Sequence, residues 1–336
     1  MNNTINFGIL GCGSIASTHV AVINSITGAN LIGVADAIEE NAKKFAEVHK
    51  IKAYQSYKEM LADPSINAIC VCTPSYFHEE NAIDALTSGK HVVLEKPMAL
   101  TTAACDRIIK KCEESGKLLT VISQNRFSDD IDRIKGLIRD GALGKISLCS
   151  LYMNYYRNPS YYKNSNWRGT LKYDGGGALI NQGIHGIDLV RYIMGNITQV
   201  QAMKKTAFHS IEAEDSLVAI VEFECGAMGT IEASTCAYPG FERRIKICGS
   251  CGYAVIVENK LEELMINGEK AETNSIVGQV STSFTNAVSD ITYHKAQFEN
   301  FIDAINGNAS VFIDGQEGKL AVDIIERIYN SANQNK

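Results

Sequence analysis

Ile9-Leu10-Gly11-Cys12-Gly13-Ser14-Ile15-Ala16 is the stretch that decides the fold of the first part of the chain. It joins a short apolar run to residues 14–25, where apolar side chains recur at helical spacing. A Gly-x-Gly-x-x-Ala loop between a strand and a helix is a dinucleotide fingerprint. Gly11 permits the tight turn, and Gly13 lets the backbone approach a pyrophosphate. The loop therefore predicts a phosphate site at the start of the helix, where Ser14 and Ile15 lie.

Strands and helices alternate on from this loop, which is the pattern of a parallel sheet. The expected strands are 6–11, 29–36, 68–72, 91–95 and 118–123. The expected helices are 14–25, 41–49, 57–62, 79–88 and 102–115. Right-handed crossovers stack such units into a doubly wound Rossmann sheet. We therefore expect an α/β dinucleotide-binding domain over residues 1–124.

The pattern changes past residue 140. The expected strands are 145–156, 200–206, 217–223, 227–235, 243–248 and 253–257, and the expected helices are 179–194, 294–305 and 316–330. Asp314 and Glu317 have capping-box spacing at the last helix. Successive strands predict an α+β domain with a large, open, mainly antiparallel sheet and helices on one face. This domain is expected to span residues 125–336, and its final helix is free to pack back on the first domain.

Length and composition exclude several classes of protein. A chain of 336 residues exceeds what one hydrophobic core usually serves, so two domains are expected. The net charge of −6, without a basic stripe, argues against a nucleic-acid partner. No apolar run reaches the roughly 20 residues of a membrane span. The first strand begins too early to follow a signal peptide, so a cytoplasmic location is expected.

Ten cysteines lie in settings that favour free thiols over disulfides. Cys70 and Cys72 fall in an apolar strand, and buried thiols of this kind are typical of reducing compartments. The only Cys-x-x-Cys motif is Cys248-Gly249-Ser250-Cys251. Because no second pair accompanies it, we interpret it as a tight turn between strands and not as a zinc site.

Polar residues follow the strands of the first domain at the ends where a dinucleotide would bind. Asp36 ends the second strand, and a carboxylate there binds a ribose 2′-hydroxyl but repels a 2′-phosphate, which favours NAD over NADP. Thr73-Pro74, with His78, follows the third strand, and Glu95-Lys96-Pro97 follows the fourth. Lys96 is a candidate for proton exchange. The alternative for Asp36 is a solvated carboxylate that binds no cofactor, and the alternative for Lys96 is a surface lysine without a catalytic role.

Three glycines, Gly175–Gly177, free the backbone just before the helix of the second domain. On this helix Asn181, His185 and Asp188 are spaced to share a face. A metal would find only two firm ligands there, so no metal site is expected. The alternative is an ordinary helical histidine that satisfies its hydrogen bonds within the protein.

Taken in order, these motifs resemble the glucose–fructose oxidoreductase / inositol dehydrogenase / MocA (Gfo/Idh/MocA) family over essentially the whole chain. The resemblance implies an NAD(P)-binding Rossmann domain and a substrate-binding domain whose open sheet mediates homodimers or homotetramers. Its members mostly oxidise or reduce a secondary alcohol on a sugar or cyclitol. It makes Lys96 and His185 the catalytic pair, with either one as the proton acceptor.

Two features of the sequence narrow the resemblance to a subgroup of the family. Many members carry an aspartate four residues before the histidine, where this chain has Asn181, an amide that only positions the substrate. Trp167-Arg168-Gly169 resembles a subgroup of sugar-nucleotide and glycoside 3-dehydrogenases. The expected reaction is hydride transfer between NAD and a ring hydroxyl of a sugar, glycoside or sugar nucleotide, with carbon 3 as first choice. The alternatives are a cyclitol dehydrogenase and a non-catalytic regulator that binds NAD and a sugar.

Aromatic residues between 152 and 173 suit either of two roles. Their rings stack on pyranosides, and nearby arginines bind carboxylates or phosphates. Tyrosines are equally enriched in oligomer interfaces. The expected substrate-binding residues are Asn181, Arg126, Tyr156, Trp167, Arg168 and Asp188. The expected cofactor-binding residues are Gly11, Gly13, Ser14, Ile15, Asp36, Thr73, Pro74, His78, Glu95, Lys96 and Asn125.

Overall fold

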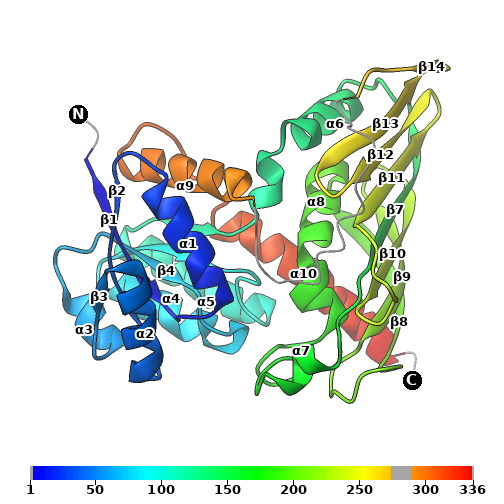
Figure 1. Cartoon of the computed structure of the whole chain (residues 1–336). Helices are drawn as coiled ribbons and strands as arrows, with labels where there is room; N and C mark the ends of the chain where they lie inside the picture. Colours follow the sequence, from blue (N-terminus) through cyan, green and yellow to red (C-terminus); the bar gives the residue numbers. More distant parts are fainter. Residues whose placement is uncertain (1–2, 274–289, 335–336) are drawn as a thin grey trace. The chain divides into compact units, whose positions relative to one another are not determined.

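The computed structural model describes residues 3–273 and 290–334 (Figure 1). The chain divides into two compact units. Unit 1 holds the described residues of Met1–Gln124 and Thr285–Lys319, and unit 2 those of Asn125–Phe284 and Leu320–Lys336. Across the part of the chain that is described, no helix combines the length and apolar character that a membrane span requires.

Unit 1 is built on a parallel sheet of six strands in the order β3-β2-β1-β4-β5-β6. The strands are β1 Ile5–Leu10, β2 Ala29–Ala35, β3 Lys52–Ala53, β4 Ala68–Val71, β5 His91–Leu94 and β6 Leu119–Val121. This order is that of a doubly wound dinucleotide-binding sheet, so the predicted fold class is confirmed. The two-residue strand β3 was not predicted, because two residues carry no periodic signal.

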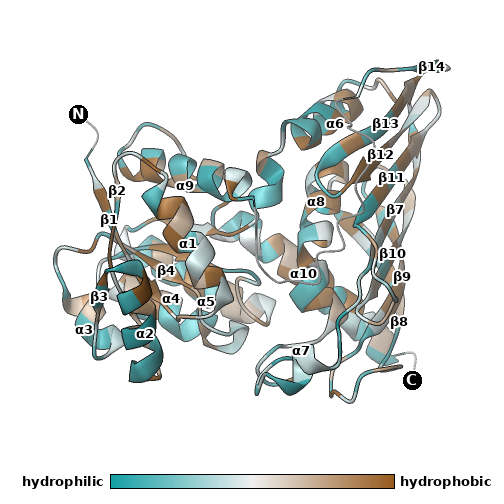
Figure 2. Ribbon diagram, in the orientation of Figure 1, coloured by the Kyte–Doolittle hydropathy of each residue, from teal (hydrophilic) through white to brown (hydrophobic). Residues whose placement is uncertain are grey.

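Helices cover the sheet of unit 1. They are α1 Ser14–Asn24, α2 Glu39–His49, α3 Tyr57–Ala62, η1 Ser75–Phe77, α4 His78–Thr87, α5 Thr102–Ser115 and α9 Thr292–Ile305. Helix α9 packs beside α1 (Figure 1), and its Phe298 and Phe301 join Phe7 in the buried core. Figure 2 shows the apolar residues of β1 and β4 in brown, whereas the outer helix α2 is mostly teal.

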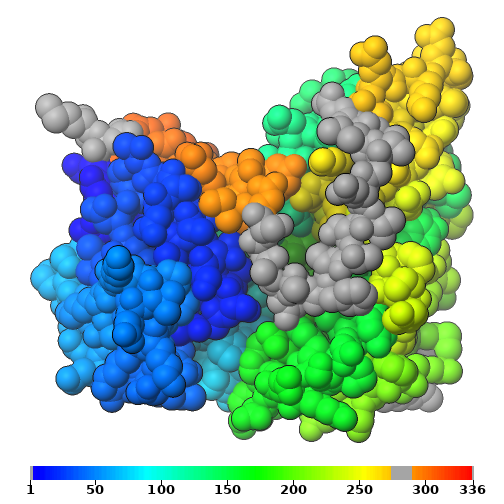
Figure 3. Space-filling model, viewed as in Figure 1, coloured from blue at the N-terminus to red at the C-terminus, as the bar shows by residue number. Residues whose placement is uncertain are grey.

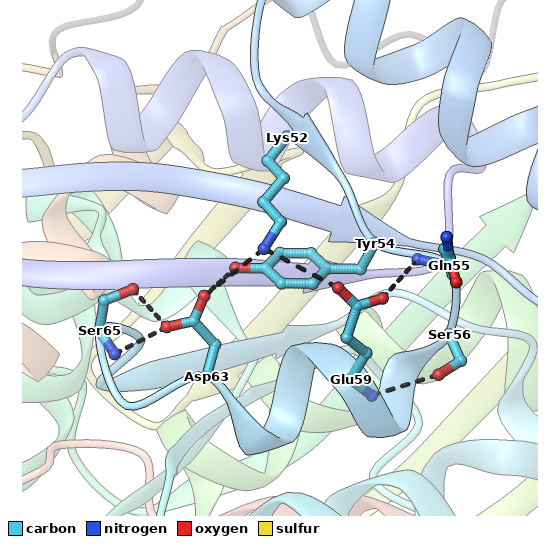
Figure 4. Close-up of polar contacts among 7 residues, drawn as sticks. All are labelled: Lys52, Tyr54, Gln55, Ser56, Glu59, Asp63 and Ser65. Atoms are coloured by element: carbon cyan, nitrogen blue, oxygen red, sulfur yellow. Dashed lines mark hydrogen bonds and ion pairs between the residues drawn. The ribbon is translucent and has the colours of Figure 1, made fainter.

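A polar cluster lies around α3, which follows the edge strand β3 of the unit 1 sheet (Figure 4). Ser56 caps α3 by accepting the Glu59 backbone N–H at 3.2 Å. Asp63 accepts a hydrogen bond from the Tyr54 hydroxyl at 2.6 Å and two more from Ser65. Hydrogen bonds from Ser65 and Tyr54 hold the pKa of Asp63 well below its usual range. The cluster fixes the β3–α3 connection by side-chain hydrogen bonds.

Unit 2 is built on an eight-stranded sheet in the order β14-β13-β12-β11-β7-β10-β9-β8. The strands are β7 Ile146–Asn154, β8 Ile197–Lys205, β9 Ser216–Phe223, β10 Met228–Ser234, β11 Arg244–Gly249, β12 Gly252–Val257, β13 Lys260–Ile266 and β14 Glu269–Lys270. Strand β7 pairs in parallel with β10, and the other neighbours pair antiparallel. The predicted open, mainly antiparallel sheet is confirmed. Strands β13 and β14 lie beyond the predicted set.

The helices of unit 2 are α6 Asp129–Arg139, α7 Ser160–Lys163, the π-helix η3 Ala178–Gly183, α8 Ile184–Met194 and most of α10 Gly315–Gln334; the short η2 Gln124–Phe127 begins at the boundary. Figure 1 shows α6 and α8 on one side of the sheet. The Glu317 N–H donates to Asp314 Oδ1 at 2.9 Å, which confirms the predicted cap of the last helix. The predicted helix from residue 179 begins as a π-helix, and α6 was not predicted.

Most of the cysteines lie where the sequence places them, but Cys72 directly follows β4, which ends at Val71. Cys70 is in β4, and Cys105 is in α5. All ten cysteines are free thiols. Cys248 lies near the end of β11, and Cys251 lies in the turn that joins β11 to the antiparallel strand β12. The interpretation of this motif as a turn between strands is confirmed.

Candidate active site

The loop between β1 and α1 has room for a phosphate. Gly11 has φ +95°, and a Cβ on it would lie 2.8 Å from the Cys72 carbonyl oxygen. A Cβ on Gly13 would meet no atom within 4 Å. No side chain caps α1, and its first turn holds no acidic residue. The N–H groups of this helix start therefore suit an anion, and the residues present fit the pyrophosphate of a dinucleotide.

Asp36 lies beside this loop, half-buried at the end of β2. Its Oδ2 accepts a hydrogen bond from the Cys12 N–H at 2.8 Å, and its Oδ1 accepts one from the Ile38 N–H at 2.9 Å. Burial, and then the charge of Asp36, raise the pKa of the Cys12 thiol to about 12. Two backbone donors thus fix the carboxylate at the carboxyl edge of the sheet, where a ribose hydroxyl would meet it.

Glu95 and Lys96 follow β5 at the same edge, because β1, β4 and β5 are parallel neighbours. Lys96 is half-buried, whereas Glu95 is only 5% exposed. Glu95 Oε1 lies 2.8 Å from His19 Nε2, and its Oε2 accepts the Lys96 N–H at 3.2 Å. Burial alone would raise the pKa of Glu95, but the bond and charge of His19, with His294 and Lys96, lower it to about 2.

His78 joins the two loops that follow β4 and β5. Its Nδ1 lies 2.7 Å from the Pro97 carbonyl oxygen and its Nε2 lies 2.8 Å from that of Thr73. Burial lowers the pKa of His78, although both carbonyl contacts oppose that effect. His78 is 1% exposed. The structure thus places His78, like Glu95, behind the loops that the sequence assigned to the cofactor, where both position the backbone.

The other expected cofactor residues differ in their exposure and in their hydrogen bonds. Ser14 is exposed and Ile15 half-buried at the start of α1. The Thr73 hydroxyl donates to Asn81 at 3.0 Å, next to the half-buried Pro74. Asn125 belongs to unit 2, where it is 8% exposed and accepts a hydrogen bond from Asn259 at 2.9 Å. Only part of the predicted set therefore lies open at the edge of the unit 1 sheet.

In unit 2, a buried carboxylate holds the start of η3. Glu214 accepts hydrogen bonds from the N–H groups of Gly177 and Leu179 and from the Tyr329 hydroxyl, at 2.8 to 3.2 Å. A Cβ on Gly177 would lie 1.9 Å from the Glu214 carbonyl oxygen, so a larger residue cannot fit. Burial raises the pKa of Glu214, and the hydrogen bonds from Leu179 and Tyr329 act against it. The glycine run thus serves a close approach of two backbone segments.

Asn181 and Gln182 on η3 belong to one hydrogen-bonded chain. Asn181 Nδ2 donates to Asp174 at 2.6 Å, and Asn181 Oδ1 accepts from Gln182 Nε2 at 3.0 Å. Asp174 is 2% exposed and also accepts the Gly169 N–H at 2.8 Å. His185 is half-buried in the first turn of α8. The amide that replaces the family's aspartate is therefore oriented by another carboxylate, Asp174.

Arg126 and Asp188, both expected to bind substrate, bind each other instead. The guanidinium of Arg126 donates two hydrogen bonds to the Asp188 carboxylate, at 2.8 and 2.5 Å. The two residues are 1% and 2% exposed. A buried bidentate pair of this kind stabilises packing when both partners are present. It fixes α8 to the segment before α6, and neither side chain is open to a ligand.

The expected aromatic residues lie in the segments on either side of α7. Tyr156 makes an edge contact with Tyr238, with ring centroids 5.2 Å apart. Trp167 is half-buried, and its ring centroid lies 5.2 Å from the Arg168 guanidinium. Sequence reasoning missed the polar residues that support both regions. These are the buried His19, His294, Asp174 and Glu214 and the half-buried Tyr329.

Asp174 had a local signal, since it directly precedes the glycine run. The other four lie far along the chain from the groups they support. The described residues contain no group of three or more His, Cys, Asp or Glu side chains arranged to hold a metal ion.

The fold and these residues define a dinucleotide-dependent oxidoreductase. A family model described as "Oxidoreductase family, NAD-binding Rossmann fold" matches residues 5–123. The model of the family's C-terminal alpha/beta domain matches residues 135–336. The chain belongs to this Gfo/Idh/MocA family of NAD-dependent oxidoreductases, and unit 1 is its NAD-binding Rossmann fold. The predicted family and cofactor are confirmed.

Similar proteins include several dehydrogenases. The myo-inositol 2-dehydrogenase of Thermotoga maritima is 25% identical, over 95% of this chain and 93% of that protein. The D-glucoside 3-dehydrogenase of Escherichia coli is 24% identical, over 98% and 96%. The crystal structure of the WlbA dehydrogenase from Bordetella pertussis, in complex with NADH and UDP-GlcNAcA, has a TM-score of 0.89 and 30% identity, covering 100% of this chain and 97% of that one.

Proposed function

We propose that this protein uses NAD to oxidise a ring secondary hydroxyl of a sugar, glycoside or sugar nucleotide, or to reduce the matching ketone. The observation that carries the proposal is the carboxyl edge of the parallel sheet. A glycine loop open at Gly13, a fixed carboxylate at Asp36 and a half-buried lysine at Lys96 share that edge. Together they provide for a dinucleotide and for a group that handles an alcohol beside it.

The residues that would hold NAD are the backbone of Gly11–Ile15 at the pyrophosphate and Asp36 at a ribose hydroxyl. When bound, NAD supplies the acceptor of the hydride. Asp36 should make NAD(H) bind at least about tenfold tighter than NADP(H), a difference of about 1.4 kcal/mol, because its carboxylate repels a 2′-phosphate. Calorimetric titration with both cofactors measures this ratio. Equal affinities would remove Asp36 from the cofactor site.

Lys96 and His185 are proposed as the catalytic pair. His185 would take the proton of the substrate hydroxyl, since an imidazole accepts protons near neutral pH. Lys96 would donate a hydrogen bond to the same oxygen and stabilise the charge that develops on it. The two roles are exchangeable. Asn181, held by Asp174 and Gln182, would orient the sugar without moving a proton.

A pyranoside or nucleotide-linked sugar is the proposed substrate. The resemblance to WlbA, whose structure holds UDP-GlcNAcA, supports a nucleotide-linked sugar. The D-glucoside 3-dehydrogenase supports oxidation at carbon 3. A cyclitol is the second candidate, favoured by the inositol dehydrogenase relative. A non-catalytic regulator is the alternative that retains NAD binding without turnover.

The exposed face of the unit 2 sheet supports assembly into a homodimer or homotetramer. Leu148, Met203, Val218, Ile220 and Met228 are 48 to 65% exposed on neighbouring strands. A run of exposed apolar side chains of this kind marks an interaction surface. Sedimentation analysis of the purified protein gives the subunit number. Charged residues at Val218 and Ile220 should produce monomers.

The proposed location is the cytoplasm. Cys70, Cys72, Cys105 and Cys149 are buried free thiols. Such thiols are typical of reducing compartments. Cell fractionation with an antibody against the native protein measures the location directly.

A substrate panel tests the proposed reaction. The protein is incubated with NAD and, in separate reactions, methyl glucosides, UDP-linked hexoses, myo-inositol and a 2-hydroxy acid. NADH is followed by absorbance, and keto products are identified by mass spectrometry. The proposal expects products from the pyranosides. Best turnover of inositol would identify a cyclitol dehydrogenase. No product from any substrate, with NAD bound, would favour the regulator.

A further inference from the structure

Two arginines of unit 2 lie over one aromatic ring. The guanidinium carbon of Arg157 is 5.5 Å from the ring centroid of Tyr161, and that of Arg168 is 4.4 Å from it. Arg168 also lies 5.2 Å from the ring of Trp167. Aromatic faces attract guanidinium groups and hold them in place without neutralising them. Figure 3 shows the α7 segment, in green, at the surface of its unit.

These two guanidinium groups lack carboxylate partners. Within residues 3–273 and 290–334, neither Arg157 nor Arg168 forms an ion pair, and the Nε of each is buried without a hydrogen bond. Arg157 donates only to neutral oxygens, those of Gln182 at 2.6 Å and Tyr156 at 3.2 Å. The guanidinium of Arg168 has no hydrogen-bond acceptor in the described chain. Other arginines do pair with carboxylates: Arg107, Arg126, Arg139, Arg243, Arg244 and Arg327.

The charge of Asp174 acts on Tyr161, the ring that both arginines contact. Burial raises the pKa of Tyr161, and the charges of Arg168, Arg157 and Asp174 also affect it. Asp174 already accepts hydrogen bonds from Gly169 and Asn181 and is 2% exposed. Asp174 is therefore engaged by other groups, and among the described residues no ion pair joins it to either arginine. A partly buried cation without a partner is costly, which indicates that an anion completes the site.

Hydrogen bonds join the cluster of Arg157, Arg168 and Tyr161 to η3. This helix leads into α8, which carries the proposed catalytic histidine. Gln182 accepts from Arg157, and its Nε2 donates to the Tyr161 hydroxyl at 2.9 Å and to Asn181 at 3.0 Å. His185 follows Asn181 by four residues on the same helical stretch. One hydrogen-bonded chain therefore joins the arginine cluster to Asn181, four residues before His185.

Open space lies beside Arg168. This side chain lines a pocket of about 420 Å³ together with Lys163, His209 and the hydroxyl residues Ser165 and Thr170. The acidic residue in this lining is Glu212, whose carboxylate accepts the Leu171 N–H at 3.0 Å. The volume is within the range of small-molecule sites. Its lining of cations and hydroxyl groups suits a carboxylate or phosphate group.

We infer that Arg168 and Arg157 bind an oxyanion carried by the sugar substrate, so that the enzyme acts on acidic sugars. The oxyanion is the carboxylate of a uronic acid or the phosphate of a sugar phosphate or sugar nucleotide. This inference rests on the proposed sugar dehydrogenase function and names its substrate class. Arginine supplies a planar pair of donors that matches either group.

Matched substrates test this inference. Methyl glucuronide and UDP-glucose are compared with methyl glucoside, and glucose 1-phosphate separates the phosphate from the nucleotide. The wild-type protein should show a kcat/KM at least about tenfold higher for one of the anionic substrates. The anionic substrate that gains most identifies the carboxylate or the phosphate as the recognised group. Equal values for all four would overturn the inference while the dehydrogenase function stands.

Substitutions of the two arginines test whether these residues cause the preference for anionic substrates. Arg168→Gln and Arg157→Gln should each lower kcat/KM on the anionic substrate at least about tenfold, mainly through KM, and lower the neutral substrate's value far less. Arg168→Lys retains the charge and should recover part of the loss. The control, Arg139→Gln, changes an exposed arginine of α6 and should leave both values within about twofold. Equal losses on neutral and anionic substrates would overturn the inference.

Binding without turnover separates this inference from the proposed function. Calorimetry measures UDP and glucuronate binding to the wild-type and Arg168→Gln proteins, with thermal melting to verify folding. An anion that binds the wild type and binds Arg168→Gln at least about tenfold more weakly supports the anion site even when no sugar is oxidised. Equal binding to the two folded proteins contradicts it.

Discussion

The carboxyl edge of the unit 1 sheet and the start of η3 in unit 2 position their functional residues by different means. At the sheet edge, parallel strands end side by side, so Gly11, Asp36 and Lys96 are brought to one edge by topology. At η3, no strand order does this. Instead, hydrogen bonds to two buried carboxylates, those of Glu214 and Asp174, fix the start of the helix. The position of the residues at the sheet edge depends on the order of the strands. The position of the residues at η3 depends on individual side chains.

The largest expected effect is on turnover, with one residue from each region. Lys96→Met and His185→Ala should each lower kcat by about 10²-fold or more, about 2.7 kcal/mol in the barrier, while NAD binding persists. Asn181→Ala is the comparison variant, and its loss should be smaller because an amide only positions the substrate. Stopped-flow assays and NAD titration measure both quantities. Turnover within a few-fold of wild type in both catalytic variants would contradict the assigned roles.

The next effect tests the dependence of η3 on Glu214. Glu214→Ala leaves the buried N–H groups of Gly177 and Leu179 without acceptors and should cost about 2 kcal/mol in the free energy of unfolding. Tyr329→Phe removes one hydrogen bond to the same carboxylate and should cost about 1 kcal/mol. Urea unfolding followed by fluorescence measures both. A Glu214→Ala protein as stable as wild type would show that the helix start does not depend on this carboxylate.

Acid should weaken unit 1 through His294. Burial lowers the pKa of His294 to about 4, so below its ordinary 6.5 the unfolded chain takes up a proton that the folded chain refuses. Stability therefore falls as the pH drops from 6.5 towards 4, by about 1 to 2 kcal/mol between pH 7 and 5. His294→Gln should remove that part of the slope. His49→Gln, in the half-exposed last turn of α2, is the control. An unchanged slope in His294→Gln would refute this explanation.

Two glycines of one loop give the sharpest contrast. Gly13→Ala points a methyl group into the space where a phosphate would lie, so NAD binding should weaken about tenfold or more with stability unchanged. Gly11→Ala places a Cβ 2.8 Å from the Cys72 carbonyl oxygen at φ +95°, so it should lower stability by about 1 to 3 kcal/mol. Calorimetry and thermal melting distinguish the two. Normal NAD affinity in Gly13→Ala would remove the loop from the cofactor site.

The same contrast explains what the sequence could predict. The strands of unit 1 other than β3, and the residues at their ends, were predicted because apolar runs and glycines are local signals and parallel order follows from crossover rules. In unit 2 the parallel pairing of β7 with β10 was not, since no local pattern encodes which strands become neighbours. Helix α6 has a local signal, Ile131 and Ile134 at helical spacing, but it is absent from the predicted elements.

The site residues divide in the same way. Gly11, Gly13, Asp36 and Lys96 could be placed at the carboxyl edge of the sheet from sequence because each ends or follows a strand. The buried pair of Arg126 and Asp188 was assigned to substrate, since a sequence shows a charge but not its partner 62 residues away. Tyr329 and Glu214 lie 115 residues apart and meet only in the fold. Long-range polar contacts therefore account for most of what the sequence could not predict.

Isotope transfer tests the central claim most directly, that this protein moves a hydride between a ring carbon of a sugar and NAD. The wild-type protein, at a concentration above that of the substrate, is mixed with NAD and a pyranoside deuterated at carbon 3, and both products are analysed by mass spectrometry. The account predicts deuterated NADH and a 3-keto sugar in equal amounts. Transfer from a substrate deuterated at a different ring carbon would move the site of oxidation. No deuterium in NADH, with NAD and the sugar both bound, would contradict the account.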